Sequence, residues 1–176
     1  MWAVVFGDDL GHQMWKAEFR AAGWVTFAPV IWLKVDGPPR MAGEGPSSDA
    51  EHITVARPRR RVREFGGRRG HYLVHTNKSP LPPTQRVVGM KKPEDLKRIL
   101  LDYTRPGDLV VDPYAGTATV GQACVETGRR YLGSEVDPNT YALGASRLGG
   151  TTPCLPGMEP DRWREAPASE QGDLFG

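Results

Sequence analysis

The segment from Leu109 to Glu135 constrains the fold of this chain more than any other. It holds an apolar run at 109–111, a turn with Gly116, a helix-forming stretch and a second short apolar run that ends at Glu135. A strand, a glycine-containing turn, a helix and a second strand form a parallel β-α-β unit, which places its ligand at the carboxyl end of the first strand. The sequence therefore predicts an α/β fold with a ligand site at the turn.

The turn also limits the kind of ligand. Gly116 lets a ligand approach the backbone closely, and Glu135 follows about 20 residues later, where a carboxylate can accept hydrogen bonds from vicinal ribose hydroxyls. NAD, a nucleoside or an adenosyl compound would each suit this arrangement. An ordinary β-α-β turn with a surface glutamate has the same spacing, and Ala118 stands where a second glycine would strengthen the pattern. The residues alone do not identify the ligand.

The rest of the chain fits one domain, because 176 residues with 39% hydrophobic content can bury a single core. Apolar runs predict further strands at 2–6, 25–33, 53–56 and 131–134, and helical spacing predicts helices at 10–22, 117–127, 138–148 and from Pro93 onward. Residues 57–92 are expected to form an extended, partly mobile insertion, and 151–176 a flexible tail. The resulting division is 1–56, 57–92, 93–150 and 151–176.

The basic residues are concentrated although the formal net charge is only +2. One short stretch contains Glu64 as its only acid and the arginines Arg57, Arg59, Arg60, Arg61, Arg63, Arg68 and Arg69. Arginines in a Gly-rich loop suit phosphate contacts and guanine readout, and the nearby His71, Tyr72 and His75 could interleave with bases. The alternative is a solvated charged loop. We predict a DNA-binding insertion.

The cysteines and the first residues argue against a disulfide-rich, metal-binding, secreted or membrane-spanning protein. Cys124 and Cys154 cannot build a disulfide framework or a four-ligand metal site, so we expect a reduced, cytoplasmic protein without a metal. The first residues, MWAVVFGDDLGH, lack a basic region and a long apolar run, and so predict neither a signal peptide nor a membrane span.

A family resemblance narrows the choice of ligand. The segment PGDLVVDPYAGT at 106–117, followed by GRRYLGSE at 128–135, resembles the cofactor-binding end of DNA amino-methyltransferases, whose usual form is PGD-x-V-x-DPF-x-GSGT and then GR-x-x-x-G-x-E. These enzymes methylate adenine N6 or cytosine N4 with S-adenosylmethionine. The stretches WAVVFGDD, GWVTFAPVIWLK, PPRMAGEGP, EHITVARP and QGDLF are similar to parts of short phage- and prophage-type members in which the acceptor half precedes the cofactor half.

The resemblance implies a three-layer, Rossmann-like methyltransferase sheet with a basic loop insertion. It also implies a set of cofactor-binding residues, in which the turn lines the methionine side, Glu135 holds the ribose and the next two residues flank the adenine. The full set is Asp112, Pro113, Tyr114, Ala115, Gly116, Glu135, Val136, Asp137, Lys92 and Pro93. The chain departs from the family where Val88-Gly89-Met90 replace His-Pro-Thr and where Ala118 replaces glycine.

The acceptor motif of the family is not found in this sequence. The resemblance implies an Asp/Asn/Ser-Pro-Pro-aromatic loop just before the strand at 2–6, on a strand that lies between 109–111 and 2–6. Asp112-Pro113-Tyr114 is assigned to the cofactor, and Gly37-Pro38-Pro39-Arg40 lacks an acid and an aromatic. We therefore expect a sheet without one central strand, and no catalytic residue is assigned. Another polypeptide or a second copy could supply that strand, or the two neighbours could close together.

The sequence thus predicts a restriction-modification type DNA methyltransferase that uses S-adenosylmethionine on an exocyclic amino group of double-stranded DNA. It would be truncated, or would need an acceptor motif from another chain. The rival interpretation is a non-catalytic relic or accessory module that still binds cofactor or DNA. A third is a nucleoside-binding enzyme of another chemistry that shares only the β-α-β unit.

Overall fold

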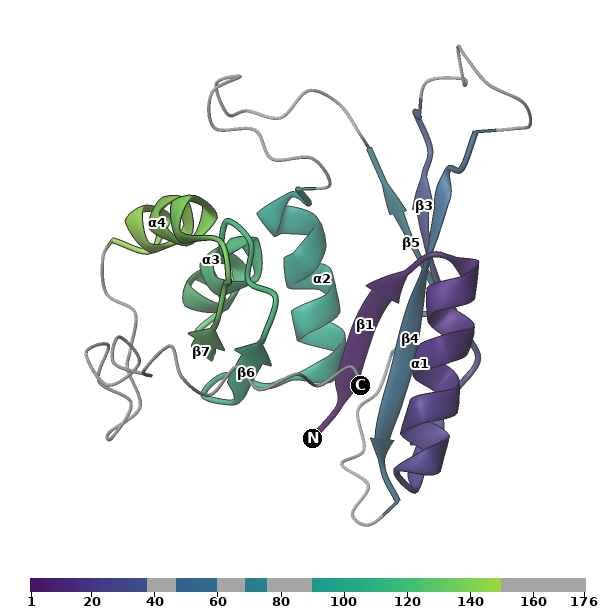
Figure 1. Ribbon diagram of the computed structural model, residues 1–176. Coiled ribbons are helices and arrows are strands. Elements are labelled where there is room, and N and C mark those ends of the chain that lie inside the picture. The colour runs from purple at the N-terminus through teal and green to yellow at the C-terminus, as the bar shows by residue number, and fades with distance from the viewer. Residues whose placement is uncertain (38–46, 60–68, 76–89, 150–176) are drawn as a thin grey trace, which may run out of the picture.

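The computed structural model describes residues 1–37, 47–59, 69–75 and 90–149 (Figure 1). The N-terminal part contains one helix and five strands: β1 (Ala3–Gly7), α1 (Asp9–Ala21), β2 (Trp24–Thr26), β3 (Val30–Lys34), β4 (Ala50–Pro58) and β5 (His71–Val74). The C-terminal part alternates helices and strands: α2 (Pro93–Tyr103), β6 (Leu109–Asp112), α3 (Thr119–Glu126), β7 (Arg130–Gly133) and α4 (Pro138–Arg147).

The strands form two separate sheets among the described residues. The larger sheet has the order β1-β4-β3-β5, with β2 also paired to β4, and the smaller sheet is the parallel pair β6-β7. β4 runs antiparallel to β1, β2 and β3, whereas β3 and β5 are parallel. β1 and β6 do not pair with each other. The sheet is therefore divided at the place where the sequence predicts a missing central strand.

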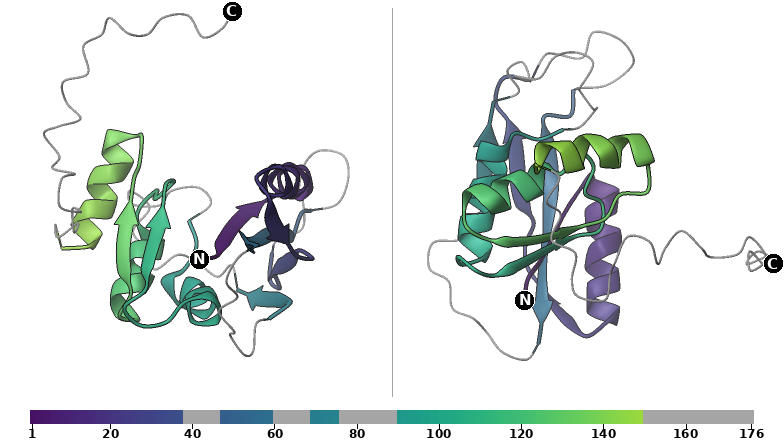
Figure 2. Two further views of the ribbon diagram at one scale, coloured as in Figure 1. Left: turned by 90° about the horizontal axis from the view of Figure 1, so that it is seen from below. Right: turned by 90° about the vertical axis from the view of Figure 1, so that its left-hand side faces the viewer.

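Helices lie on both faces of the sheets, which confirms the predicted three-layer α/β arrangement (Figure 2). α1 packs against β1, β2 and β4 on one face. α2, α3 and α4 lie on the other, where α2 contacts α3 and α3 contacts β7. Asp8 begins α1, because its carboxylate accepts a hydrogen bond from the Gly11 N–H at 2.7 Å, and Pro93 begins α2.

One hydrophobic core joins the two parts of the molecule. The apolar face of α2 is buried against side chains of both the larger sheet and α3, and the residues concerned are Leu96, Ile99, Leu100 and Tyr103 from α2, with Trp32, Ile53, Tyr72, Ala123 and Cys124 around them. Trp2, which precedes β1, meets Tyr103 edge to face, with ring centroids 5.6 Å apart. The two sheets are therefore held relative to each other by α2.

Two elements differ from the sequence-based expectation. The strand predicted at 25–33 is two strands, β2 and β3, and the break contains Pro29, which has no N–H to give to a ladder. β5 lies inside the stretch predicted as an insertion without regular structure. Its Tyr72 and Val74 are buried while His71 and Leu73 are exposed, so the prediction that Tyr72 contacts bases is wrong.

His12 of α1 makes the stability of this fold dependent on pH. The ring is buried, its Nδ1 lies 2.8 Å from Thr54 Oγ1, and it stacks on His52. Burial lowers the pKa of His12, helped by Lys16 and His52 and opposed by Asp9. The folded state therefore favours the neutral ring. Stability should be full above the ordinary histidine pKa, roughly 6.5, and should fall as pH drops through it.

Urea unfolding at pH 7.5 and pH 5.5 measures this effect. The midpoint of the wild-type chain is expected to be lower at pH 5.5, and His12→Gln should show a smaller difference between the two pH values. An equal loss in the variant would assign the pH dependence to other groups.

Candidate cofactor site

The turn after β6 is fixed to the end of β7 by hydrogen bonds through Ser134. The Ser134 N–H donates to the Asp112 carbonyl at 3.0 Å, and its hydroxyl donates to the Pro113 carbonyl at 3.0 Å. The Ala115 N–H donates back to the Ser134 carbonyl at 2.9 Å. These bonds continue the β6-β7 pairing beyond the strands, so the turn has a defined position relative to the residues that follow β7.

Glu135 lies directly across from Gly116. The Gly116 N–H donates to Glu135 Oε2 at 2.8 Å, and the Asp137 N–H donates to Oε1 at 3.0 Å. Hydrogen bonds from Asp137 and Gly116 hold the pKa of Glu135 below its ordinary value, so the side chain is an ionised acceptor at neutral pH. A carboxylate has about four acceptor positions. Two bonds to the backbone leave room for a pair of hydroxyl donors from a ligand.

The surface in front of this pair is open and apolar. Gly116 has φ +54°, and no atom lies within 4 Å of the place where a Cβ would stand. Tyr114 is 80% exposed and Val136 is 96% exposed, although both are large hydrophobic side chains. An apolar surface beside a fixed carboxylate is typical of a site that binds a flat ring and a polar sugar.

A cleft continues from the turn toward α4. Its walls are formed by the turn, by the end of β7 and by α4, and among its lining residues are Gly116, Gly133, Glu135, Tyr141 and Gly144. Gly144 lets α4 pack close to the turn, because an added Cβ there would lie 3.1 Å from the Ala118 side chain. The turn therefore borders a cavity as well as open surface.

Asp112 points toward β7. Its Oδ1 accepts from the Tyr114 N–H at 3.3 Å, and its Oδ2 lies 3.4 Å from the Tyr131 hydroxyl. Burial raises the pKa of Asp112, and the hydrogen bonds from Tyr114 and Tyr131 oppose that rise. Both oxygens thus contact groups of the protein, and Asp112 acts here by shaping the turn.

Arg147 connects the turn to the start of α2. Its guanidinium donates to the Thr117 carbonyl at 2.9 Å and to Gln122 Oε1 at 2.7 Å, and it lies 3.8 Å from the Met90 sulfur. Met90 precedes Lys92, the N-cap of α2, and Pro93. The same guanidinium thus contacts both the turn and Met90, two residues before Lys92.

Ala118 has a strained backbone at the end of the turn. It is the only described non-glycine residue with a positive φ, at 54°, and it is 5% exposed. We expect Ala118→Gly to stabilise the protein by about 0.5–1 kcal/mol and to raise Tm by roughly 1–4 °C, because glycine adopts this conformation without a Cβ clash. Ala115→Gly, at an ordinary φ, should destabilise instead. Thermal unfolding measures both, and equal effects would contradict the strain.

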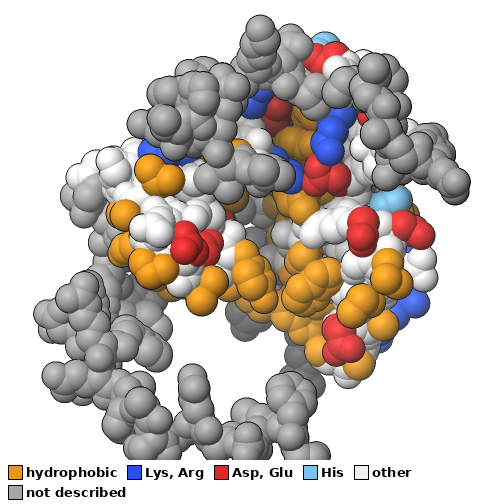
Figure 3. Space-filling model, turned by 45° about the horizontal axis from the view of Figure 1, so that its top comes forward, with side chains coloured by type: hydrophobic (Ala, Val, Ile, Leu, Met, Phe, Trp, Pro, Cys, Tyr) orange, Lys and Arg blue, Asp and Glu red, His pale blue; other side chains and the backbone are white. Residues whose placement is uncertain are grey.

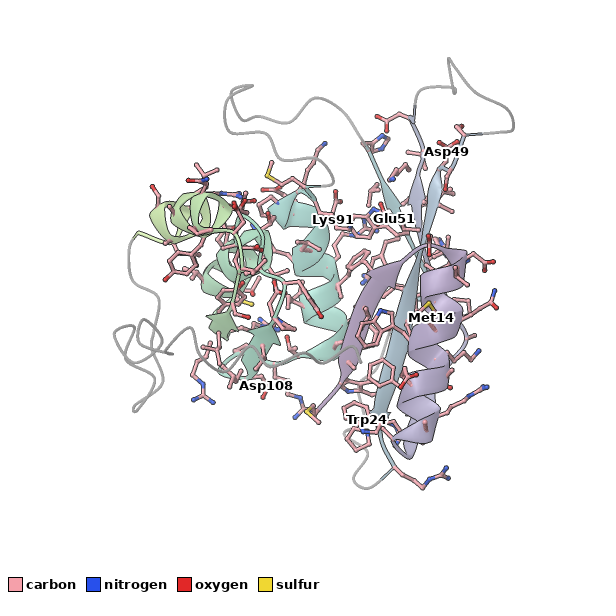
Figure 4. All side chains as sticks on the ribbon, viewed as in Figure 1. Met14, Trp24, Asp49, Glu51, Lys91 and Asp108 are labelled. Carbon is pink, nitrogen blue, oxygen red and sulfur yellow. The ribbon has the colours of Figure 1, made fainter. Side chains whose placement is uncertain are left out.

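Lys91 and Glu51 link the two parts of the molecule near the top of the sheets (Figure 4). Lys91 Nζ lies 2.9 Å from Glu51 Oε2 and 4.3 Å from the centre of the Phe6 ring, while Lys34 Nζ lies 3.0 Å from Glu51 Oε1. Burial by itself would raise the pKa of Glu51, but the hydrogen bonds from Lys91 and Lys34 hold it below its ordinary value. Sequence reasoning missed this cluster, because no spacing relates residues 34, 51 and 91.

The predicted DNA-binding arginines are only partly described. Arg60, Arg61, Arg63 and Arg68 lie outside the described residues, and Arg59 is exposed. Arg57 faces Val25 in the β2-β4 register and lies over the Phe27 ring at 5.8 Å. Arg69 donates to both oxygens of Asp102, each at 2.7 Å. Arg57 and Arg69 therefore make contacts within the protein.

The position of β4 also separates Arg57 from the turn. β4 begins beside the carboxyl end of β1, where His52 faces Gly7, and ends beside the start of β1, where Ala56 faces Ala3. Figure 4 marks the two edges: Glu51 and Lys91 lie above, and Trp24, which pairs with Pro58, lies below. DNA binding by the arginine stretch remains a prediction. The position of Arg57, at the opposite edge of the sheet from the turn, does not favour it.

Two absences concern the described part of the chain. No helix there is long and apolar enough to span a membrane. No three His, Cys, Asp or Glu side chains within it gather as a metal site would require.

Comparisons with known proteins bear on this site. The family model N6_N4_Mtase, described as DNA methylase, matches residues 89–145, which include the turn, Glu135 and the start of α2. Type II methyltransferase M.XycI of Xanthomonas campestris pv. cyanopsidis is 27% identical over 155 residues, which cover 81% of this chain. The cofactor half of the chain is thus similar to DNA amino-methyltransferases. A second relative, DNA adenine methyltransferase YhdJ of Escherichia coli K12, is 42% identical over 59 residues, or 33% of this chain and 20% of that protein.

The family comparison extends to the fold and to chain length. The crystal structure of the M1.HpyAVI-SAM complex matches with a TM-score of 0.70 and 22% identity over 84% of this chain and 74% of that one. At that identity the likeness concerns the fold, and it confirms the predicted methyltransferase architecture. The chain spans 51% of the length of M.XycI, so it corresponds to about half of this family relative.

Proposed function

We propose that this protein is an S-adenosylmethionine-dependent DNA methyltransferase that acts on an exocyclic amino group, adenine N6 or cytosine N4. The observation that supports it most is the ionised Glu135 held opposite Gly116 at the end of a parallel strand. The match of the DNA methylase family model to residues 89–145, which include Gly116 and Glu135, supports an adenosyl ligand at this site. Double-stranded DNA is the proposed partner and the cytoplasm the proposed location.

The residues at the turn fit an adenosyl cofactor. Glu135 has acceptor positions left for two ribose hydroxyls, and the open face of Gly116 leaves space beside the backbone. Val136 and Tyr114 offer exposed apolar surface to the adenine and to the methionine side, and Asp137 fixes the start of α4 by accepting from the Thr140 N–H at 2.7 Å. S-adenosylmethionine, when bound, supplies an electrophilic methyl group for direct transfer to an amino nitrogen.

The chain's own contribution to the reaction is binding and orientation. The bonds through Ser134 and the contacts of Arg147 keep the turn in one position, so a bound ligand would meet a preorganised surface. Lys92 and Pro93 complete the proposed site from α2. The acceptor loop for the target base is not among the described residues, and we propose that a second polypeptide or a second copy supplies the strand that carries it.

Calorimetric titration with S-adenosylhomocysteine tests this function. We expect saturable binding at one site per chain, and no binding of NAD under the same conditions. Binding of NAD alone would assign the turn to a different chemistry. Transfer of tritiated methyl groups to plasmid DNA then tests whether the chain is active without a further segment.

A non-catalytic relic or accessory module of the same family is the second candidate. The observation that favours it is that no described strand pairs with the second edge of β1 or of β6, next to a turn that is otherwise intact. This candidate predicts that the chain binds S-adenosylhomocysteine, yet transfers no methyl group to DNA even when the acceptor segment of a relative is added.

A further inference from the structure

The ammonium group of Lys91 is held by side chains from three strands of the larger sheet. Its Nζ lies 2.9 Å from Glu51 Oε2 of β4 and 4.3 Å from the centre of the Phe6 ring of β1. The centre of the Trp32 ring of β3 lies 5.8 Å from the same nitrogen. Figure 3 shows acidic and basic side chains gathered beside hydrophobic ones at the top of the hollow between the two parts. Lys91 thus attaches the chain just before α2 to the N-terminal sheet.

This contact is largely shielded from water. The Lys91 side chain is 20% exposed and the Glu51 side chain is 27% exposed. Ion pairs at the open surface hold their side chains weakly, because water solvates both charges once they separate. A partly buried ammonium with a carboxylate and two aromatic rings around it resists separation, since the free charge would be poorly solvated. The pair with Glu51 therefore keeps Lys91 in one place.

The residue before Lys91 is attached to the other part of the molecule. The Met90 sulfur lies 3.8 Å from an Arg147 nitrogen, and the same nitrogen donates to the Thr117 carbonyl at 2.9 Å. Thr117 directly follows Gly116 of the turn. Two consecutive residues therefore contact opposite parts, one the N-terminal sheet and the other the guanidinium that binds the turn.

The start of α2 has no side-chain cap of its own. Lys92 is the N-cap residue and makes no capping hydrogen bond through its side chain, and Pro93 has no N–H. The body of α2 is held by its core-facing side chains, which begin at Leu96. The placement of Lys92 therefore depends on the contacts of Met90 and Lys91.

We propose that Lys91 is a positioning residue for the cofactor site, and that its ion pair with Glu51 holds Lys92 and Pro93 in place beside the 112–116 turn. This inference rests on the proposed function, in which Lys92 and Pro93 complete the site. A ligand that meets a preorganised segment loses no binding free energy in ordering it. The N-terminal sheet therefore takes an indirect part in cofactor binding.

Lys91→Met and Lys34→Met form a matched pair of variants. Each removes one lysine that pairs with Glu51 and keeps an unbranched apolar side chain, but Lys34 belongs to β3 and lies 3.0 Å from Glu51 Oε1. We expect S-adenosylhomocysteine to bind Lys91→Met roughly 10-fold more weakly than wild type, because the segment must then be ordered on binding. Lys34→Met should bind within about 2-fold of wild type. Calorimetric titration gives the Kd values.

A conservative variant and thermal unfolding separate positioning from a loss of stability. A guanidinium also pairs with a carboxylate and stacks on aromatic rings, so Lys91→Arg should recover most of the affinity that Lys91→Met loses. A purely structural role would lower Tm in Lys91→Met without separating its Kd from that of Lys34→Met. Equal Kd values in these two variants would overturn the proposal, as would a Kd for Lys91→Arg as weak as that for Lys91→Met.

Hydrogen exchange distinguishes this inference from the proposed function. The Asp95 and Leu96 N–H groups donate to the Lys92 carbonyl, so their exchange in the unliganded chain reports on the start of α2. Exchange there should be faster in Lys91→Met than in wild type or Lys34→Met, and equal exchange in the three proteins would overturn the inference. If wild type does not bind S-adenosylhomocysteine, the proposed function fails, and exchange alone decides whether Lys91 positions this segment.

Discussion

Replacing Glu135 with alanine should weaken S-adenosylhomocysteine binding roughly 100-fold, because hydrogen bonds to a charged group are the strong ones in a ligand site. The carboxylate is fixed by the Gly116 and Asp137 N–H groups, which leave it further acceptor positions. Alanine removes the acceptors and leaves the Gly116 N–H without its bond. Calorimetric titration of both proteins gives the ratio of the two Kd values.

Two further variants make this result specific. Glu135→Gln keeps one acceptor oxygen without the charge, so its affinity should lie between those of wild type and Glu135→Ala. Glu126→Ala removes an exposed acid on α3 that pairs with Lys97, away from the turn, and should bind as wild type does. An unchanged Kd in Glu135→Ala would remove the ribose role and with it the adenosyl assignment.

Replacing Asp102 with alanine should destabilise the fold by about 3 kcal/mol, the usual cost of removing one partner from a buried polar network. Asp102 of α2 is 8% exposed and accepts from the Tyr72 hydroxyl at 2.7 Å and from Arg69. Tyr72 is fully buried, so the variant leaves its hydroxyl without this acceptor. A change of this size corresponds to a fall in Tm of roughly 6–12 °C for a chain of this length.

The neighbouring variants separate the two bonds of Asp102. Asp102→Asn retains an acceptor for Tyr72 and should be less destabilised than Asp102→Ala. Tyr72→Phe removes the hydroxyl that would otherwise be left unpaired, so Tyr72→Phe combined with Asp102→Ala should cost less than the sum of the two single variants. Additive losses would show that the two groups act independently. Denaturant unfolding at neutral pH measures all of them.

The β-α-β region was predictable because its signals are local. The run Leu109–Val111, the glycine at 116 and the acid at 135 follow one another within one structural unit, so spacing along the chain translates directly into position. Serine at 134 has no distinctive spacing, and only the structure reveals that it holds the turn through hydrogen bonds to Asp112 and Pro113.

The central stretch was less predictable because its structure depends on distant contacts. β5 is short, and only Tyr72 and Val74 point inward, so its pattern is weak until β3 pairs with it. The contact of Arg69 was also unpredictable, because its partner Asp102 lies 33 residues away along the chain. A run of arginines suggested nucleic acid, but the sequence could not show that β4 carries Arg57 to the opposite edge from the turn.

The sequence by itself determined the resemblance to DNA amino-methyltransferases, the order of most elements and the residues of the turn, since each is recorded by short-range spacing. Only the tertiary structure decided that the Gly116 N–H donates to Glu135, that Lys91 reaches Glu51, and that Arg69 pairs with Asp102. The physical reason is that pairing and side-chain contact depend on how α2 holds the two sheets, which involves residues far apart in the chain.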